Sequence, residues 1–348
     1  MAAIFPDLSA NNFLIQGCKY NKFPIKCYIC PALGDNGFMA YTGEIISLVV
    51  AVSWTATALF TDAAGKRVRP IPLNLIRMLM SITLLALTLW FVLGSPYPVY
   101  ADGKTWFWLA MSGLVGYVFG DFCLFSAYAV IGSRFGQLFM TLAPPVAGIA
   151  GMLFLGESLS LMSWLAMLVT VSGIGLSILN RGRNGRLSFK LPFKGILFGI
   201  GAGVGQGLGL VLSKVGMNYY IAALPTDAPA AMETIMPFAS TFIRAVAGTV
   251  GFAALVALRR GFPAVGTGIR DGKAMKLILM ATIFGPFVGV SLSLMAVNYT
   301  KAGIASTLMA LTPVLIIWPY SIIFRQKVTF REVVGAVVSI VGVAMFFL

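Results

Sequence analysis

Long apolar segments, each about long enough to cross a bilayer, alternate with short polar connections from about residue 43 to the C-terminus. A transmembrane helix needs about 20 apolar residues. Backbone in lipid must satisfy its own hydrogen bonds, and barrel strands would give a much less hydrophobic pattern. We therefore predict an all-α integral membrane protein with ten transmembrane helices, at about 43–63, 70–94, 105–129, 134–155, 160–179, 194–217, 233–258, 274–297, 302–324 and 329–348.

The first 42 residues form a polar tail without the long apolar core or the cleavage site of a secretory signal. Because Met39 stands just before the first predicted span, we take it as an alternative natural start. Cys27 and Cys30 in this tail have CxxC spacing, but no second pair completes a zinc tetrahedron. We expect neither a metal site nor a cofactor.

The composition agrees with a membrane protein and excludes several chemistries. Apolar residues make up 59% of the chain and charged residues only 10%, whereas soluble domains are about one quarter charged. The absence of histidine excludes catalytic triads and metal sites that depend on imidazole. The net charge of +14 lies in short basic clusters between apolar segments, so we expect no nucleic-acid partner.

The basic residues indicate an orientation. We call the side of the N-terminus X and the opposite side Y. The Y connections hold 17 Lys and Arg, and the X connections with the N-terminal tail hold six. Since cytoplasmic loops are enriched in Lys and Arg, this bias predicts that Y is cytoplasmic and that both termini lie outside.

The chain contains an internal repeat. A shift of 169 residues places Leu142-Ala-Pro144 on Leu311-Thr-Pro313, and Gly116 and Gly120 on Gly285 and Gly289. Slightly different shifts place Val52-Ser-Trp54 on Val204-Gly-Gln206 and Ile76-Arg77 on Ile243-Arg244. We therefore predict two five-helix repeats, residues 43–180 and 194–348, joined by a basic loop at 181–193.

Five is an odd number of spans, which has a consequence for the second repeat. That repeat must enter the membrane from the opposite side, so the two halves are inverted relative to each other. Inverted repeats suit alternating access, because two equivalent halves can exchange conformations around a central site.

The ordered motifs resemble the EamA unit, which occurs twice in transporters of the drug/metabolite superfamily. They are the Arg-containing second span, Ala143-Pro-Pro145, Leu155-Gly-Glu157 and the Gly-rich fifth span. The resemblance implies a carrier for small metabolites, amino acids or drugs, often an exporter of a bacterial-type plasma membrane, with a cavity between the first, third and fourth helices of each half. Gln326 departs from the family pattern, which has Glu there, and the family's cytoplasmic termini oppose the charge bias.

Three charges inside the predicted spans are functional candidates, because a charge in lipid is costly unless it is paired or hydrated. Arg77 and Asp121 lie at similar depths from the Y side, so they are candidates for an ion pair. Asp121 is also a candidate for binding a coupling proton. Arg244, the repeat equivalent of Arg77, has no acidic partner in its half, which leaves a role in folding and a role in binding an anionic substrate group equally open.

Polar and aromatic side chains at repeat-equivalent positions are candidates for lining a substrate cavity, although each alone is as compatible with bridging two helices. Pro144 and Pro313 remove helix hydrogen bonds and predict kinks. Glu157 stands at a short X-side turn, where we expect a capping role. The cavity candidates are Trp54, Tyr117, Asp121, Gln137, Gln206, Phe287, Ser291 and Ser306.

The sequence favours a secondary carrier that moves a small molecule through the lipid bilayer by alternating access. Gly116 and Gly120 permit close helix packing, and the glycine-rich segment 199–209 does not match a nucleotide-binding motif. Without an ATP site, a substrate or proton gradient has to supply the energy. A channel, a membrane-embedded enzyme and a lipid-flipping protein are the alternatives.

Overall fold

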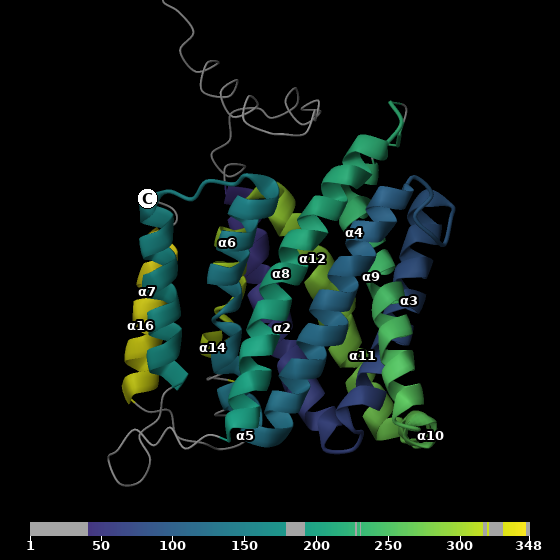
Figure 1. The fold of residues 1–348 in the computed structure, drawn as a ribbon, viewed down its shortest axis with the longest axis horizontal. Coiled ribbons are helices and arrows are strands. Elements are labelled where there is room, and N and C mark those ends of the chain that lie inside the picture. Colours follow the sequence, from purple (N-terminus) through teal and green to yellow (C-terminus); the bar gives the residue numbers. More distant parts are fainter. Residues whose placement is uncertain are drawn as a thin grey trace, which may run out of the picture.

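The computed structural model of the protein describes residues 41–178, 192–226, 228–229, 231–315, 319 and 330–345. In this part of the chain the regular elements are helices, and most of them run side by side as a bundle (Figure 1). The upper end of Figure 1, where the first helix begins, is the X end of the sequence prediction.

The apolar segments form helices near the predicted places. Six helices are long and apolar enough to cross a membrane, and three shorter apolar helices accompany them, so the count of ten spans stays a prediction. The first half contains α2 (Thr42–Gly65), α3 (Pro70–Leu93), α4 (Gly103–Gly113), η2 (Leu114–Asp121), α5 (Phe122–Met140), α6 (Ala143–Leu155) and α7 (Leu161–Ile178).

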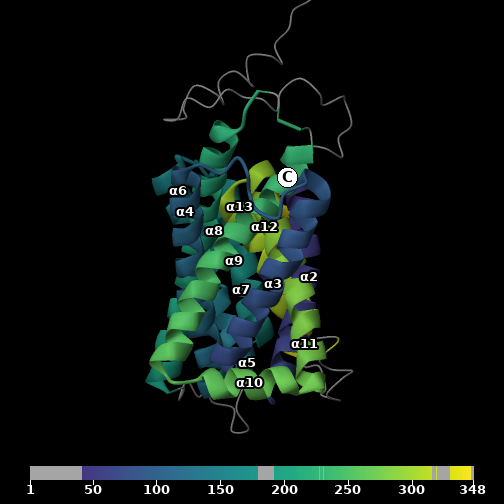
Figure 2. The same ribbon diagram turned by 90° about the vertical axis from the view of Figure 1, so that its right-hand side faces the viewer.

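The second half contains the same kinds of elements, with the additional helix α10 and with two helices, α12 and α13, after its π-helical segment where the first half has α5. Its elements are α8 (Phe193–Ala223), α9 (Ala231–Leu258), α10 (Phe262–Arg270), α11 (Gly272–Thr282), η3 (Ile283–Phe287), α12 (Val288–Tyr299), α13 (Ala302–Met309), α14 (Thr312–Leu315) and α16 (Phe330–Ala344). The sequence prediction missed α10, which lies across the Y end of the bundle (Figure 2).

The predicted helix boundary at residues 130–133 is wrong, because α5 continues to Met140 and the helix is interrupted at Thr141 and Leu142. Pro144 then lies in the first turn of α6, where its missing N–H and fixed φ cost nothing. Pro313 is the second residue of α14, after the interruption at residues 310–311. The prolines thus follow helix breaks instead of kinking continuous helices.

Helices α4 and α11 repeat each other closely. Each has 11 residues, and each begins after an aspartate whose side chain accepts backbone hydrogen bonds: Asp102 from Thr105, and Asp271 from Lys273 and Ala274. Each continues into a π-helical segment, η2 or η3, and such segments are frequent at functional sites. The N-terminus of α4 lies at the X end and that of α11 at the Y end (Figure 1), so the two helices run in opposite directions.

The last helix of each half forms a pair at one edge of the bundle (Figure 1). Ser339 in α16 donates a hydrogen bond to the carbonyl of Thr170 in α7, and the two positions are 169 residues apart. Gly173 and Gly342, which have the same separation, pack against Ser339 and Thr170 without space for a side chain. The contact is thus the same when seen from either helix.

Glycines allow α8 to lie directly against η2. A Cβ on Gly209 would lie 2.8 Å from the Cα of Gly116, and a Cβ on Gly205 would lie 2.8 Å from the Cα of Gly120. Only glycine permits this approach between two backbones. The predicted packing role of Gly116 and Gly120 is confirmed.

Candidate functional site

A cavity of about 150 Å³ lies between the helices of the two halves. This is enough space for a small organic molecule. Apolar and aromatic groups form most of its wall, and a few polar groups project among them, as in small-molecule sites generally. The sequence candidates that line it are Trp54, Arg77, Tyr117, Asp121, Gln206, Arg244 and Ser306.

Asp121 and Gln206 join the two halves inside this cavity. Gln206 Nε2 donates a hydrogen bond of 2.7 Å to Asp121 Oδ1 and one of 3.2 Å to the carbonyl of Gly116. Arg77 donates instead to Asn74 Oδ1, at 3.1 Å, and its guanidinium lies 5.6 Å from the centre of the Phe125 ring. The predicted Arg77–Asp121 ion pair is not formed among the described residues, because each side chain has another partner.

Arg244 lines the cavity from near the middle of α9. It is 4% exposed, and its guanidinium lies 4.8 Å from the centre of the Tyr117 ring. Gly248, one turn further along α9, leaves space for that ring. Tyr117 thus fills the wall of the cavity beside the arginine.

Repeat-equivalent residues occupy equivalent places. A Cβ on Gly289 would lie 2.9 Å from Trp54 Nε1, and a Cβ on Gly120 would lie 3.2 Å from Gln206 Nε2. The two arginines show the same relationship, since their Nη2 atoms would lie 3.1 Å (Arg77) and 3.0 Å (Arg244) from a Cβ on Gly285 and Gly116. Each half therefore presents one N–H-bearing side chain of its first helix and one arginine of its second helix to the third helix of the other half.

Three of the predicted cavity residues are not among the residues that line the cavity. Phe287 packs edge-on against Phe238, with ring centres 6.0 Å apart, and Ser291 donates to Thr241 Oγ1 at 3.2 Å. Both side chains therefore contact a neighbouring helix, which is the bridging role that the sequence left open as the alternative to lining the cavity. The side chain of Gln137 is outside the described part of the chain.

The sequence prediction missed the α5 side of the cavity. Leu124, Phe125 and Tyr128 line it together with Asp121. These four residues have the i, i+3, i+4 and i+7 spacing of one helix face, so the spacing from Asp121 was the available signal.

Along α2 the cavity lies nearer the Y end than the X end. On α2 the lining residues extend from Trp54 to Thr61. Thr61 is one turn, or about 6 Å, before the Y end of α2, whereas Trp54 is about 18 Å from its X end at 1.5 Å per residue. Along this helix more protein lies on the X side of the cavity, whereas on α13 Ser306 lines the cavity only one turn after the helix begins at the X end.

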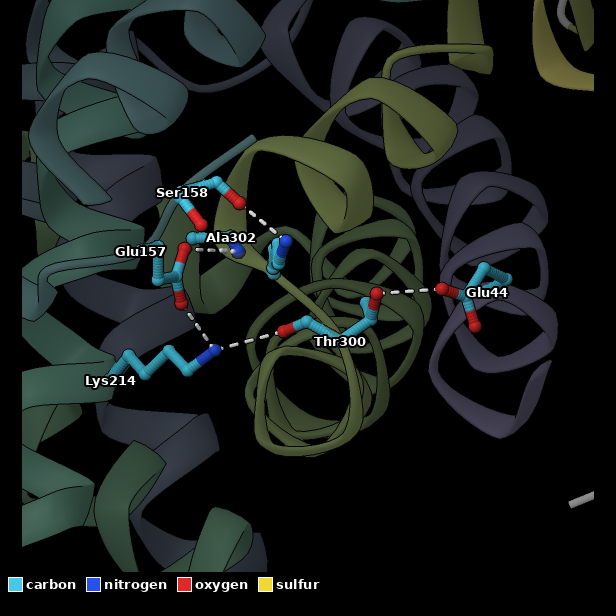
Figure 3. Close-up of polar contacts among 7 residues, drawn as sticks. Glu44, Glu157, Ser158, Lys214, Thr300 and Ala302 are labelled. Carbon is cyan, nitrogen blue, oxygen red and sulfur yellow. Dashed lines mark hydrogen bonds and ion pairs between the residues drawn. The ribbon is translucent and has the colours of Figure 1, made fainter. Parts of the chain in front are cut away.

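Polar contacts join residues of the two halves at the X end (Figure 3). Lys214 Nζ donates to Glu157 Oε1 at 2.6 Å and to the carbonyl of Thr300 at 2.9 Å. The backbone N–H of Ala302 donates to Glu157 Oε2 at 3.0 Å, and Thr300 Oγ1 donates to Glu44 Oε1 at 2.6 Å. We call these five residues the X-end network.

The X-end network connects residues from both halves. Glu44 and Glu157 belong to the first half, and the other members belong to the second. Glu157 also binds the free N–H at the start of α13, where a carboxylate is favoured by the helix dipole. Gly156, whose φ is +67°, provides the turn that ends α6 just before Glu157. The predicted capping role of Glu157 is thus seen on a helix of the other half.

A bundle of apolar helices with a partly polar central cavity is the architecture of multi-pass membrane transporters. A family model described as the EamA-like transporter family matches the chain twice, at residues 41–179 and 193–348. The chain therefore belongs to the EamA-like transporter family. It is an integral membrane protein of a family that transports small molecules.

The fold is also found in solved structures. One titled "Crystal structure of protein" superimposes with a TM-score of 0.61 over 88% of this chain and 96% of that chain, at 17% sequence identity. A likeness at this identity concerns the fold alone. A comparison with curated proteins found no match.

Proposed function

We propose that the protein is a secondary carrier in which two inverted five-helix repeats, residues 43–180 and 194–348, provide alternating access to the central cavity. The equivalent but opposite directions of α4 and α11 support the inversion. The contacts of the repeat-equivalent arginines, and of Trp54 and Gln206, support a central site shared by both halves.

The observation that carries this proposal is the unequal closure of the cavity. On α2 its lining extends to within one turn of the Y end, where an exposed ion pair of Arg67 and Asp271 joins the two halves. The X-end network instead contains the more buried pair of Lys214 and Glu157. Leu210 and Ser306 line the cavity one turn from Lys214 and Ala302, respectively. We infer that the X side is closed in this conformation and that separation of the X-end network opens it.

The charge bias supports a Y end that faces the cytoplasm of a bacterial-type plasma membrane. A cavity close to the Y end then receives substrate from the cytoplasm, which favours export. Trp54, Tyr117, Gln206 and Ser306 are the proposed substrate contacts. Asp121, the acidic residue among the cavity-lining residues, is the proposed site of a coupling proton.

Exchange in proteoliposomes tests the carrier function. Vesicles containing the purified full chain are loaded with a candidate solute that stabilises the protein against heat, and uptake of the labelled solute is followed. A carrier shows saturation and counterflow, in which an internal solute accelerates external uptake. Flux that does not saturate, without counterflow, supports the channel alternative and contradicts the proposal.

A further inference from the structure

Arg244 is a buried cation without a polar partner in the described part of the chain. Its Nε is buried without a hydrogen bond, and no ion pair or hydrogen bond joins its guanidinium to another described residue. The charged guanidinium of Arg244 lies over the ring of Tyr117. A guanidinium has five N–H donors, and a buried donor without an acceptor is costly. Such a group is expected to bind an acceptor from outside the protein.

The other charges in the cavity do not supply that acceptor. Asp121 is held by Gln206, and Arg77 donates to Asn74. The lining contains the two arginines and one aspartate, so with ordinary ionisation the cavity has one excess positive charge. One monovalent anion restores neutrality, whereas an organic cation would add a second excess charge in a site of low polarity.

The rest of the wall defines the body of such an anion. Trp54, Phe125, Tyr128, Leu210 and Met309 provide apolar surface around the arginine. A guanidinium prefers planar oxygen anions, because its N–H groups form two parallel bonds with a carboxylate. The ring of Tyr117 restricts the orientation of the guanidinium by lying against it.

We propose that Arg244 binds the carboxylate of an organic monoanion with an apolar body, and that this is the substrate class of the carrier. The inference rests on the proposed function, because it places the ligand in the same cavity. It predicts that the protein discriminates a carboxylate from a neutral molecule of the same shape.

Ligand-induced thermal stabilisation of the purified full chain tests this inference. The probes are acetate, benzoate and phenylacetate, each compared with its own amide, and phenethylamine as the cation. At least one carboxylate is expected to raise Tm more than its amide, and phenethylamine is not. If each amide stabilises the protein as well as its carboxylate, the inference is wrong, and this result needs no variant.

The variant Arg244→Gln assigns the discrimination to Arg244. We expect the apparent Kd for the active carboxylate to rise at least about tenfold, since a charge-assisted hydrogen bond is lost, while the Kd for the amide stays unchanged. Arg259→Gln removes the same charge from an exposed position and is the matched control. Arg244→Lys keeps the charge without the planar fork, and we expect intermediate affinity. Unchanged carboxylate affinity in either Arg244 variant contradicts the inference.

Transport measurements separate this inference from the carrier proposal. A protein that exchanges solutes in counterflow but treats carboxylates and amides alike is a carrier of another substrate class. A protein that binds carboxylates through Arg244 but shows no counterflow has the proposed site without the proposed carrier function.

Discussion

Lys214 and Glu157 form an ion pair across the two halves of the protein, with Nζ and Oε1 2.6 Å apart. Their side chains are only 16% and 12% exposed. The repeat-equivalent positions are Asp62 and Gln326, which cannot form an ion pair with each other. The repeat therefore does not reproduce this pair at the Y end, where the more exposed pair of Arg67 and Asp271 joins the two halves instead. A buried pair whose partners lie on different halves can act as a switch between two conformations.

Removal of this ion pair is predicted to favour opening on the X side. Single variants leave one buried charge unpaired, so the double variant Glu157→Gln/Lys214→Gln is the cleaner test. We expect a cysteine placed at Ser306 to react at least about fivefold faster from the X side in the double variant, which corresponds to about 1 kcal/mol in the opening equilibrium. Reaction with a membrane-impermeant maleimide measures this rate.

A charge exchange provides the control for that prediction. Glu157→Lys/Lys214→Glu keeps an ion pair but breaks the contact of Glu157 with the N–H of Ala302. We expect partial restoration of slow X-side labelling. Equal labelling of the wild-type protein and the double Gln variant would show that the pair does not close the X side.

The contact between Gln206 and Asp121 predicts a functional difference between two variants. Gln206→Leu removes the donor to Asp121 and is expected to weaken solute affinity about tenfold, because a buried carboxylate loses its hydrogen bond. Asp121→Asn keeps a hydrogen-bonding side chain of the same shape but cannot carry a coupling proton. We expect it to retain binding and to lose the response of transport to a pH gradient.

The measurement for that pair is solute uptake with and without an imposed pH gradient. Ser293→Ala, another substitution in the cavity wall, is the matched control, because Ser293 donates to a backbone carbonyl of its own helix. If the Asp121→Asn variant keeps the wild-type response of transport to the pH gradient, Asp121 is excluded as the proton site.

The close approach of α8 to η2 predicts that Gly209→Ala is destabilising. The new methyl group would lie 2.8 Å from the Cα of Gly116, where the neighbour is backbone and cannot rotate away. We expect a loss of about 1–3 kcal/mol, as in other overpacked sites. Gly266→Ala in α10 is the control, because a Cβ on Gly266 would meet no other atom within 4 Å and alanine favours a helix. If the two variants have the same Tm in detergent, this account is contradicted.

The two aspartate caps predict a dependence of stability on pH. Interaction with Thr105, whose backbone N–H donates to Asp102, lowers the pKa of Asp102. The N–H of Ala274, followed by the side chain of Arg67, lowers the pKa of Asp271. A lowered pKa means that the folded state favours the charged form. The stabilisation is therefore present above the ordinary carboxyl pKa of 3.8 and is lost as pH falls through the lowered pKa.

Substitution of these caps tests the same effect. Asp102→Ala and Asp271→Ala are expected to lower Tm at neutral pH, whereas the Asn variants retain most of the stability because asparagine is an equally good cap. The difference in Tm between wild type and the Ala variants should shrink as the pH falls below the ordinary carboxyl pKa of 3.8 and the carboxylates take up protons. A difference that stays constant over this range would show that the charged carboxylates do not contribute.

Much of the central site could be predicted from the sequence because it depends on positions that the repeat defines. Trp54 and Gln206, and Arg77 and Arg244, are paired by the shift between halves, and both pairs line the cavity. Phe287 and Ser291 could not be excluded in this way, since the face of a helix that points to the cavity depends on its local rotation. The π-helical segment η3, which ends at Phe287 and precedes Ser291, changes that rotation.

Side-chain contacts between segments that are distant in the sequence could not be predicted. Equal depth from the Y side suggested that Arg77 binds Asp121, but depth gives no information on competing partners such as Asn74 and Gln206. Glu157 was expected to cap a turn, and its ion pair with Lys214 requires knowledge of which helices meet at the X end. Such contacts depend on tertiary packing more than on local pattern.

Access to the cavity from the two sides tests alternating access most directly. In a chain whose four cysteines are replaced by alanine, a single cysteine at Thr61 or Ser306 is offered a membrane-impermeant label from each side in turn. Lys273→Cys and Tyr97→Cys are exposed markers of the Y and X ends. We predict labelling of both cavity cysteines from the Y side, and transfer of reactivity at Ser306 to the X side when a transported solute is present. Simultaneous reactivity of both cavity positions from both sides, unchanged by solute, would contradict the account.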